Sequence, residues 1–309
     1  MKYICSADWH LRSTNPVSRL DDYSETILRK IGFIVECANQ YNAAMLVAGD
    51  LLHNTKVSTV SYEAINRLSA LLKQCTKGVY AVPGQHDLLN HNEDITKSPY
   101  GTLVDSGAII NIAVNPALKQ GTIVENIYGC GWGYMDFTDN EHMHNSSADI
   151  VLLHFCVTPG DPPFFLAEQA KKSSDVASYF NSYMFIIAGD YHIAHKYKHK
   201  NTLLINCGSV GRSNKDQMNH KPACYLIDTD KPGKVKRIII PHKSAEEVFS
   251  KASLVQDTHT SEFSDKIKEL SELLKDKKKQ PNFKNTVLYL MKKYNTTKEE
   301  IELAESYME

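Results

Sequence analysis

The chain has 309 residues, of which 42% are hydrophobic and 23% are charged, and its formal net charge is −1. This length fits one large α/β domain with a smaller appendage, or at most two domains, and a core of that size requires no disulfide staples. The nearly neutral charge argues against a protein that coats nucleic acid by global electrostatic attraction. Affinity for phosphate must therefore come from a local feature, such as bound metal or a small basic patch.

The seven cysteines are scattered and form no CxxC pair, which is typical of reduced thiols in a cytosolic protein. The first residues, MKYICSADWH, lack the features of a signal peptide, and no apolar stretch reaches membrane-spanning length. The sequence therefore predicts a cytoplasmic protein with no membrane segment.

Apolar runs typical of strands alternate with amphipathic helical patterns in the first part of the chain. We predict strands at residues 2–7, 43–48 and 78–82, and helices at residues 21–40 and 62–75. This alternation predicts a largely parallel sheet covered by helices. The second half is richer in strands, which are predicted at residues 149–154, 184–188, 203–206, 223–227 and 235–240.

The pattern changes after residue 240, so we divide the chain into a domain of residues 1–240 and a helical tail of residues 241–309. Between residues 261 and 279, Phe263, Ile267 and Leu270 follow the spacing of an amphipathic helix. Further helices are predicted at residues 283–294 and from Thr297, which forms a capping-box pattern with Glu300.

Polar side chains suited to metal binding follow the ends of five predicted strands. They are Asp8, His10, Asp50, His53, Gln85, His86, Asp87, His154, Asp190 and His192. Ligands bind outside the carboxyl ends of strands in open α/β sheets, so these side chains are expected to share one edge. Divalent metal would relieve the crowding of like charge there, and mixed Asp/His ligation favours Mn²⁺, Fe²⁺ or Zn²⁺ over Ca²⁺. Two ions about 3.5–4 Å apart would clamp a phosphoryl group.

Each of these motifs has an ordinary explanation when it stands alone. A Gly-Asp pair is usually just a turn, and His154 could be a hydrogen-bonded core histidine. Five such motifs in order, each at the end of an apolar run, are hard to produce by accident. Together they predict a metal site.

The ordered motifs resemble the signature of the calcineurin-like metallophosphoesterases over roughly residues 1 to 240. The matching positions are Asp8 and His10, Gly49 and Asp50, residues 84–87, His154, and residues 189–192. The resemblance implies a β-sandwich flanked by helices, with two metal ions between the sheets. It therefore revises the single parallel sheet that the alternation alone predicts.

Within that superfamily the chain looks most similar to the SbcD-type DNA repair nucleases, including phage-encoded forms. Three features carry this likeness: His53 in GDLLH, the segment NCGSVGRS at residues 206–213, and the helical tail. In such nucleases the tail binds an SbcC-type ATPase. The resemblance implies DNA as substrate and an ATPase partner, and it leaves a homodimer open.

The resemblance also implies a role for each matching residue. A first metal would be held by Asp8, His10, Asp50 and His192. A second would share Asp50 and add Gln85, His154 and Asp190. His86, oriented by Asp87, would protonate the leaving oxygen or steady the transition state, and His53 would contact the scissile phosphate or its nucleotide.

Two positions depart from the family pattern, and both belong to the second metal. Gln85 stands where the family usually has Asn, and Asp190 stands where it usually has His. The amide oxygen of Gln85 lies one methylene further out, and Asp190 adds a third carboxylate. A third carboxylate favours harder ions, so we expect Mn²⁺ first and Mg²⁺ as an alternative.

The leading hypothesis is thus a metal-dependent DNA exonuclease or endonuclease, the nuclease subunit of an SbcC/SbcD-like complex in DNA repair, recombination or phage DNA metabolism. A second hypothesis is a phosphodiesterase or phosphatase that acts on small molecules or phosphoproteins through the same metal core. A third is a scaffold whose altered second-metal ligands have weakened or abolished catalysis.

Overall fold

The computed structural model describes residues 1–250, except residues 55, 57–58, 93, 114–122, 125, 134–136, 138–147, 164–165, 167–168 and 215–216. Met1–Val255 form one compact unit, and Gln256–Glu309 form a second unit that lies outside the described residues. The helices predicted between residue 261 and the C-terminus fall in that second unit, so they stay predictions. No helix in the described part of the chain combines the length and apolar character needed to cross a bilayer.

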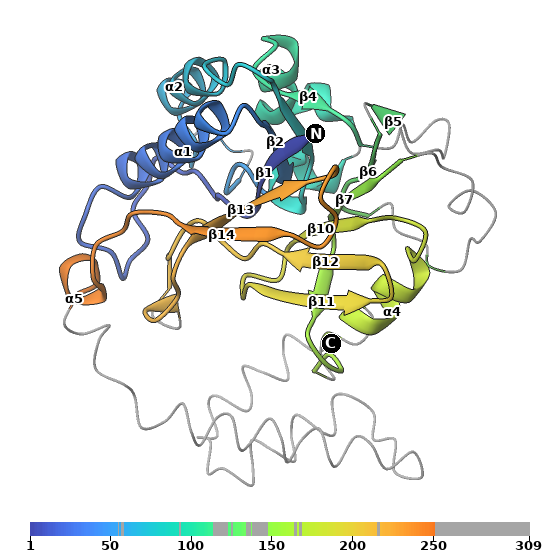
Figure 1. Cartoon of the computed structure of the whole chain (residues 1–309). Helices are drawn as coiled ribbons and strands as arrows, with labels where there is room; N and C mark the ends of the chain where they lie inside the picture. Colours follow the sequence, from blue (N-terminus) through green and yellow to red (C-terminus); the bar gives the residue numbers. More distant parts are fainter. Residues whose placement is uncertain are drawn as a thin grey trace, which may run out of the picture. The chain divides into compact units, whose positions relative to one another are not determined.

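The first sheet has six strands in the order β14-β13-β1-β2-β3-β4 (Figure 1). Its parallel half consists of β1 (Lys2–Ser6), β2 (Ala44–Ala48), β3 (Val79–Val82) and β4 (Ile110–Asn111). The antiparallel strands β13 (Ala223–Asp228) and β14 (Val235–Ile239) extend it beyond β1.

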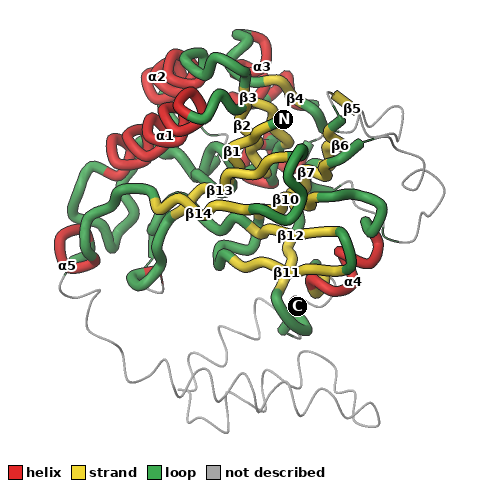
Figure 2. The backbone as a smooth tube through the Cα atoms, in the orientation of Figure 1, coloured by secondary structure: helices red, strands yellow, loops and turns green. Residues whose placement is uncertain are grey.

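The second sheet also has six strands, in the order β11-β12-β10-β7-β6-β5 (Figure 2). The parallel strands are β6 (Ile127–Cys130), β7 (Ile150–His154), β10 (Phe185–Gly189) and β12 (Thr202–Asn206). Antiparallel β5 (Ile123–Val124) and β11 (His195–His199) form its edges. A separate parallel pair joins β8 (Cys156–Thr158) to β9 (Ala170–Lys172).

Helices cover the outer face of each sheet. Three of them, α1 (Tyr23–Gln40), α2 (Tyr62–Leu72) and α3 (Pro99–Asp105), share a hydrophobic core with the first sheet. α4 (Ser173–Tyr179) shares a core with the second sheet. The shorter elements are η1 (Gln85–Asp87), η2 (Leu89–His91), η3 (Ile95–Lys97) and α5 (Ala245–Val248).

A third hydrophobic core lies between the two sheets, and the alternation of side chains along each strand divides them between cores. In β1, Tyr3 and Cys5 belong to the core between the sheets, whereas Ile4 faces the helices. Because both faces of the central strands are buried, these strands read in the sequence as continuous apolar runs. The four-layer β-sandwich is confirmed, and the single parallel sheet suggested by alternation alone is wrong.

Each of the two long helices begins directly after a residue whose side chain caps it. Asp22 precedes α1 and accepts a hydrogen bond from the backbone N–H of Glu25 at 2.9 Å. Ser61 precedes α2 and accepts one from Ala64 at 3.2 Å. Each cap satisfies a backbone donor that has no partner within its helix.

Candidate metal centre

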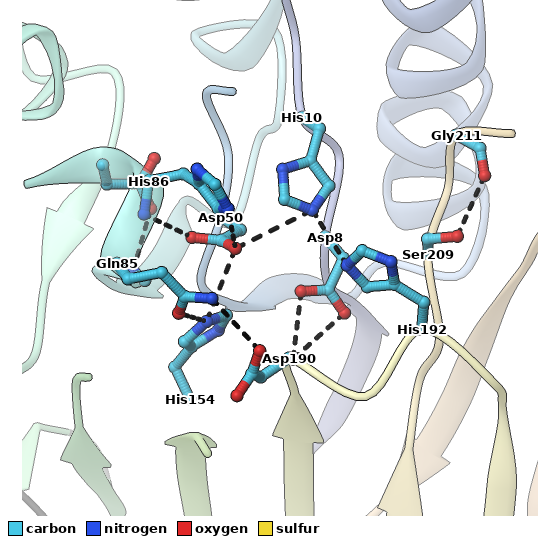
Figure 3. Close-up of polar contacts among 12 residues, drawn as sticks. Asp8, His10, Asp50, Gln85, His86, His154, Asp190, His192, Ser209 and Gly211 are labelled. Carbon is cyan, nitrogen blue, oxygen red and sulfur yellow. Dashed lines mark hydrogen bonds and ion pairs between the residues drawn. The ribbon is translucent and has the colours of Figure 1, made fainter. Parts of the chain in front are cut away.

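The carboxyl ends of β1, β2 and β3 in one sheet meet those of β7 and β10 in the other (Figure 3). An unbroken chain of contacts of 4 Å or less joins the seven predicted metal ligands. These residues are Asp8, His10, Asp50, Gln85, His154, Asp190 and His192. The convergence that the sequence analysis expects at one edge is therefore present.

Four of these residues have a backbone conformation that residues other than glycine rarely adopt. The φ angles are 51° at Asp8, 47° at His10, 51° at Asp50 and 84° at Asp190. Left-handed conformations of this kind cost about 1–2 kcal/mol per residue and cluster at functional sites. Hydrogen bonds between the turns hold two of them in place. The backbone N–H of Asp8 donates to the carbonyl of Gly49, and that of His10 donates to the carbonyl of Asp50.

Two glycines allow the backbone to approach the centre closely. A Cβ on Gly84 would overlap the carboxylate of Asp50, and a Cβ on Gly49 would overlap the ring of His154. Gly49 also has a φ of +81°, which favours glycine on its own account. The glycine in each of these two motifs is therefore required by the packing of the neighbouring metal-site side chain.

Asp50 lies at the middle of the cluster, and one of its oxygens has no hydrogen-bond partner. Its Oδ1 accepts from the backbone N–H of His86 at 2.9 Å, whereas its buried Oδ2 is unpaired. That Oδ2 is 3.6 Å from Nε2 of His154, 3.7 Å from Nε2 of His10 and 4.0 Å from Nε2 of His86. Burial, together with the nearby carboxylates of Asp87 and Asp8, raises the pKa of Asp50 well above its ordinary value.

The hydrogen bonds of His154 leave a lone pair directed into the cluster. Its Nδ1 is 2.7 Å from the carbonyl oxygen of Ala48, so this nitrogen must carry the donating proton. In the neutral ring Nε2 then bears a lone pair, yet it lies 2.9 Å from Oε1 of Gln85. Two acceptors therefore face each other. If the amide of Gln85 is flipped, its nitrogen can donate to His154, but its oxygen then faces Oδ1 of Asp190, which is 3.2 Å from the present position of the amide nitrogen. A cation among these acceptors removes the conflict.

A similar arrangement joins Asp8, His10 and His192. Nε2 of His10 is 3.0 Å from Nε2 of His192, and Nδ1 of His10 is buried without a partner. Burial and the neighbouring histidines, His192 foremost, hold the pKa of His10 well below its ordinary value, so the ring is neutral and can donate a lone pair. Burial also raises the pKa of Asp8 to about 7.

Three groups of these side chains have ligand atoms close enough to share an ion. They are Asp8 with His10 and His192; His10 with Asp50 and His86; and Asp8 with Asp50 and His154. The donor set fits a divalent cation for two reasons. Nε2 of His154 faces the amide oxygen of Gln85, and the buried Oδ2 of Asp50 has no hydrogen-bond partner.

The two predicted catalytic histidines stack on each other. The rings of His53 and His86 are 5.4 Å apart and nearly parallel, and each lies edge-on to His10. Burial is the main cause that lowers the pKa of both rings, to about 4 for His53. Both are therefore neutral at pH 7 in the free protein.

Asp87 was expected to orient the His86 ring, but its hydrogen bonds go to backbone groups instead. Its buried carboxylate accepts hydrogen bonds from the backbone N–H groups of Leu51, Leu52 and Gly84. The His86 ring instead bonds to the backbone of His53. Asp87 thus fixes the two turns that carry Asp50 and His86, because its oxygens satisfy backbone donors that would otherwise be buried and unpaired.

The end of β12 and the segment after it form hydrogen bonds with the backbone of the turns that carry Asp8 and His192. Ser209 donates its backbone N–H to the carbonyl of His192, and Val210 donates to that of Asp8. The amide of Asn206 donates to the carbonyls of Tyr191 and Ile193. The segment NCGSVGRS therefore fixes the backbone of the turns that carry the candidate metal ligands.

A cleft of about 750 Å³ borders Gln85, Asp190 and His192. Three aromatic residues line it, Trp132, Phe155 and Tyr191, and none of them was predicted as a site residue. Trp132 lies far from the metal motifs in the sequence, whereas Phe155 follows His154 directly and Tyr191 stands between Asp190 and His192.

Comparisons with known proteins identify a family. Residues 1–160 match the family of calcineurin-like phosphoesterases. No curated protein sequence matches the chain significantly. Similar solved structures include a novel archaeal phosphodiesterase, with a TM-score of 0.40 and 15% identity, covering 77% of this chain and 99% of that one.

Another similar structure is described as a putative 5′-nucleotidase from Staphylococcus aureus in complex with alpha-ketoglutarate. It has a TM-score of 0.44 and 13% identity, covering 87% of this chain and 58% of that one. This chain therefore spans less than two thirds of that protein. The family match, in contrast, spans more than half of the 309 residues and includes the motifs of Asp8, Asp50, His86 and His154. The chain belongs to the calcineurin-like phosphoesterase family.

Proposed function

We propose that the chain is a metal-dependent DNA nuclease that hydrolyses phosphodiester bonds at a two-metal centre. The observation that carries the proposal is the convergence of the side chains of Asp50, His154, Gln85 and His10 on one point, where the buried Oδ2 of Asp50 has no hydrogen-bond partner. An aromatic cleft beside the same ligands supports a nucleic-acid substrate.

One ion would be held by Asp8, His10, Asp50 and His192, and the other by Asp50, Gln85, His154 and Asp190. Bound divalent ions supply Lewis-acid polarisation of the phosphoryl group and activation of water. The carboxylates of Asp8, Asp50 and Asp190 favour Mn²⁺ or Mg²⁺ over softer ions.

The two departures from the family pattern contact each other, which supports a working second site. The amide nitrogen of Gln85 is 3.2 Å from Oδ1 of Asp190, and its oxygen faces His154. The longer amide thus reaches the carboxylate that replaces the usual histidine. This pairing argues against the scaffold hypothesis, because Oε1 of Gln85 faces His154 while its amide nitrogen holds the carboxylate of Asp190 beside the cluster.

His86 is the residue we assign to the leaving oxygen. Its side chain is 40% exposed, so a substrate can reach it, while its backbone N–H is tied to Asp50. The neutral ring donates its N–H to the oxygen on which charge develops. His53 stacks on His86 and faces the charge of Arg12, which places a cation near an incoming phosphate.

The cleft is suited to bases rather than to the sugar-phosphate backbone. Trp132, Phe155 and Tyr191 offer faces for stacking, and the described residues that line the cleft include no lysine or arginine. Base stacking on aromatic side chains contributes about 1–3 kcal/mol per base and tolerates any sequence. We therefore assign single-stranded DNA, or a frayed end, as the substrate.

The test compares Mn²⁺-dependent turnover of a single-stranded oligonucleotide, a cyclic nucleotide and an aryl phosphate. Asp50→Ala and His86→Ala should abolish or strongly reduce turnover of every substrate. Tyr191→Ala should raise KM for the oligonucleotide and leave aryl phosphate turnover unchanged. Tyr62→Ala is the matched control, since Tyr62 is 69% exposed on α2. Turnover of the cyclic nucleotide without turnover of DNA would overturn the nuclease assignment.

A small-molecule phosphodiesterase is the second candidate, and the size of the cleft favours it. A volume of about 750 Å³ lies within the range of about 300–1,000 Å³ that is usual for small-molecule sites. The same three-substrate comparison separates the two candidates.

The proposed complex with an SbcC-like ATPase depends on the tail, which lies outside the described residues. Its support is the resemblance of the predicted helices to the partner-binding segment of SbcD-type nucleases. A truncation that tests it should end at Val255, because Val248 and Phe249 are buried in the first unit. This truncation should lose ATPase binding and keep hydrolysis of a small diester; retained ATPase binding would refute the role of the tail.

A further inference from the structure

We propose that a second cavity, which shares no lining residue with the cleft beside the metal centre, binds a small phosphate-bearing anion. This basic cavity lies between the loop before α1, α1 itself, Arg212 and the segment around α5, and its volume is about 530 Å³. Its lining includes the cationic or basic side chains of Arg19, Arg29, Lys30, Arg212, His242 and Lys243, and also the carboxylates of Asp21 and Glu247.

Three of these cations are buried, and only one of them has a carboxylate partner. Arg19, Lys30 and Arg212 are 6%, 4% and 3% exposed. Arg19 forms a bidentate pair with Asp21, with both N–O distances at 2.8 Å. In the described residues, the hydrogen bonds of the other two go only to backbone carbonyls: Lys30 donates to Val210, and Arg212 donates to Met218 and Lys243.

Carbonyl dipoles do not neutralise two buried charges. Taking an ion out of water costs several kcal/mol unless an opposite charge accompanies it. Lys30 shows this cost: burial lowers its pKa to about 7, Arg212 and Arg19 lower it further, and the carboxylate of Asp21 opposes the shift only in part. Arg19 and Arg212 also lie over the ring of Phe249, at 5.3 and 5.9 Å, which disperses charge without cancelling it.

Donors remain open on the residues that line the basic cavity. Nε of Arg212 is buried and has no hydrogen-bond partner, and Lys30 uses one of its three ammonium protons on Val210. Arg29 is exposed and bonds to the hydroxyl of Thr26 at 3.2 Å, so its other donors are available. Arginine forks and an ammonium group together match the oxygens of a phosphate.

The volume of the basic cavity exceeds what an inorganic ion needs, and part of its lining is apolar. Phe33, Pro241 and Val248 contribute that part. The shared chemistry is thus a phosphate group, supplied either by free phosphate or by a small organic phosphate such as a nucleoside monophosphate.

Thermal unfolding and calorimetric titration test the proposal, with EDTA-treated full-length protein so that metal contributes nothing. The probes are inorganic phosphate and AMP, with sodium chloride at equal ionic strength. Wild type should gain several degrees in Tm with either phosphate or AMP and nothing with chloride. A larger gain with AMP identifies an organic phosphate as the ligand, and equal gains identify the phosphate group alone.

Two variants distinguish a binding site from a structural network. Lys30→Met removes a buried, uncompensated charge, so it should raise Tm without phosphate and weaken phosphate binding about tenfold or more. Arg29→Gln changes an exposed residue and should weaken binding without lowering Tm. Lys73→Gln, at an exposed position after α2, is the control.

Opposite results would overturn the inference. If Lys30→Met lowers Tm and the phosphate response persists in both variants, Lys30 only holds Val210 in place. If wild type responds equally to chloride and phosphate, the basic cavity binds no phosphate. Neither result bears on the nuclease proposal, because the measurements use no metal and no turnover.

Discussion

Replacing Asp50 by Asn removes one charge from the middle of the metal centre and changes little else. The Asn can keep the hydrogen bond from the backbone N–H of His86, and its amide nitrogen would face the lone pairs of His10 and His154 where Oδ2 now has no partner. An unsatisfied buried polar group costs about 1–3 kcal/mol, and more when it is charged. The metal-free variant should therefore be more stable than metal-free wild type by an amount of this order.

Mn²⁺ should stabilise wild type more than Asp50→Asn, which is the reverse of the order expected without metal. At a free concentration of about 100 times Kd, each bound ion stabilises the folded state by about 2.7 kcal/mol. For a unit of this size, 1 kcal/mol shifts Tm by about 2–4 °C, so one ion should raise the Tm of wild type by about 5–10 °C. Asp50→Asn should lose most of this rise, since Asp50 is the ligand assigned to both ions.

The assay is thermal unfolding with and without Mn²⁺, with Asp105→Asn as control because Asp105 is an exposed carboxylate at the end of α3. The control should behave like wild type in both conditions. A variant that is less stable without metal, or that gains as much from Mn²⁺ as wild type, would refute the reasoning.

Three further predictions concern single side chains. Gly84→Ala places a Cβ against the carboxylate of Asp50, so Mn²⁺ binding and hydrolysis should fall together. In the control Gly160→Ala, the added Cβ meets no atom within 4 Å, so neither property should change. Unchanged Mn²⁺ binding by calorimetry in Gly84→Ala would contradict this prediction. His86→Gln should lower kcat by about 10²–10⁴ while Mn²⁺ affinity stays the same, and a loss of metal binding would make His86 a ligand instead. At Lys30 the pKa falls from 10.5 to about 7 on folding, so the unfolded chain binds more protons between these values and stability rises with pH across that window. The rise is at most about 1.4 kcal/mol per pH unit, and urea unfolding at pH 7, 8 and 9 should show a smaller slope for Lys30→Met than for wild type.

The strands and helices that build the centre could be predicted because each contributes to a core on at least one face. The predicted ends of α1 and α2 and of β1, β2, β3, β7 and β10 fall within three residues of those observed. Alternation of strands and helices could not reveal two sheets, since it does not specify which strands pair. That feature came from the motif resemblance.

Elements at the edges of the fold escaped prediction for a physical reason. β11 (His195–His199) reads HKYKH, in which lysines on the exposed face alternate with partly buried rings. Such a strand has no apolar run, because an edge strand faces solvent and benefits from charge that discourages further pairing. α4 (Ser173–Tyr179) is only seven residues long and buries little besides Val176 and Ala177.

The sequence identifies the side-chain types of the site but not their contacts. Nothing in the spacing shows that Gln85 and Asp190, about a hundred residues apart, touch each other. The left-handed backbone at Asp8 and Asp50 is equally hidden, because aspartate adopts this conformation more often than most residues but still only rarely. Asp87 illustrates the limit most clearly, since its neighbour in the chain is His86 while its bonds hold the backbone of Gly84, Leu51 and Leu52.

The central claim is that acidic and imidazole side chains from both sheets hold two ions at one edge. Crystals grown with Mn²⁺ and measured at the manganese absorption edge test it most directly. We expect two anomalous peaks, one beside His10 and His192 and the other beside His154 and Asp190, with Asp50 between them. Ordered density for these side chains without an anomalous peak, in saturating Mn²⁺, would contradict the account.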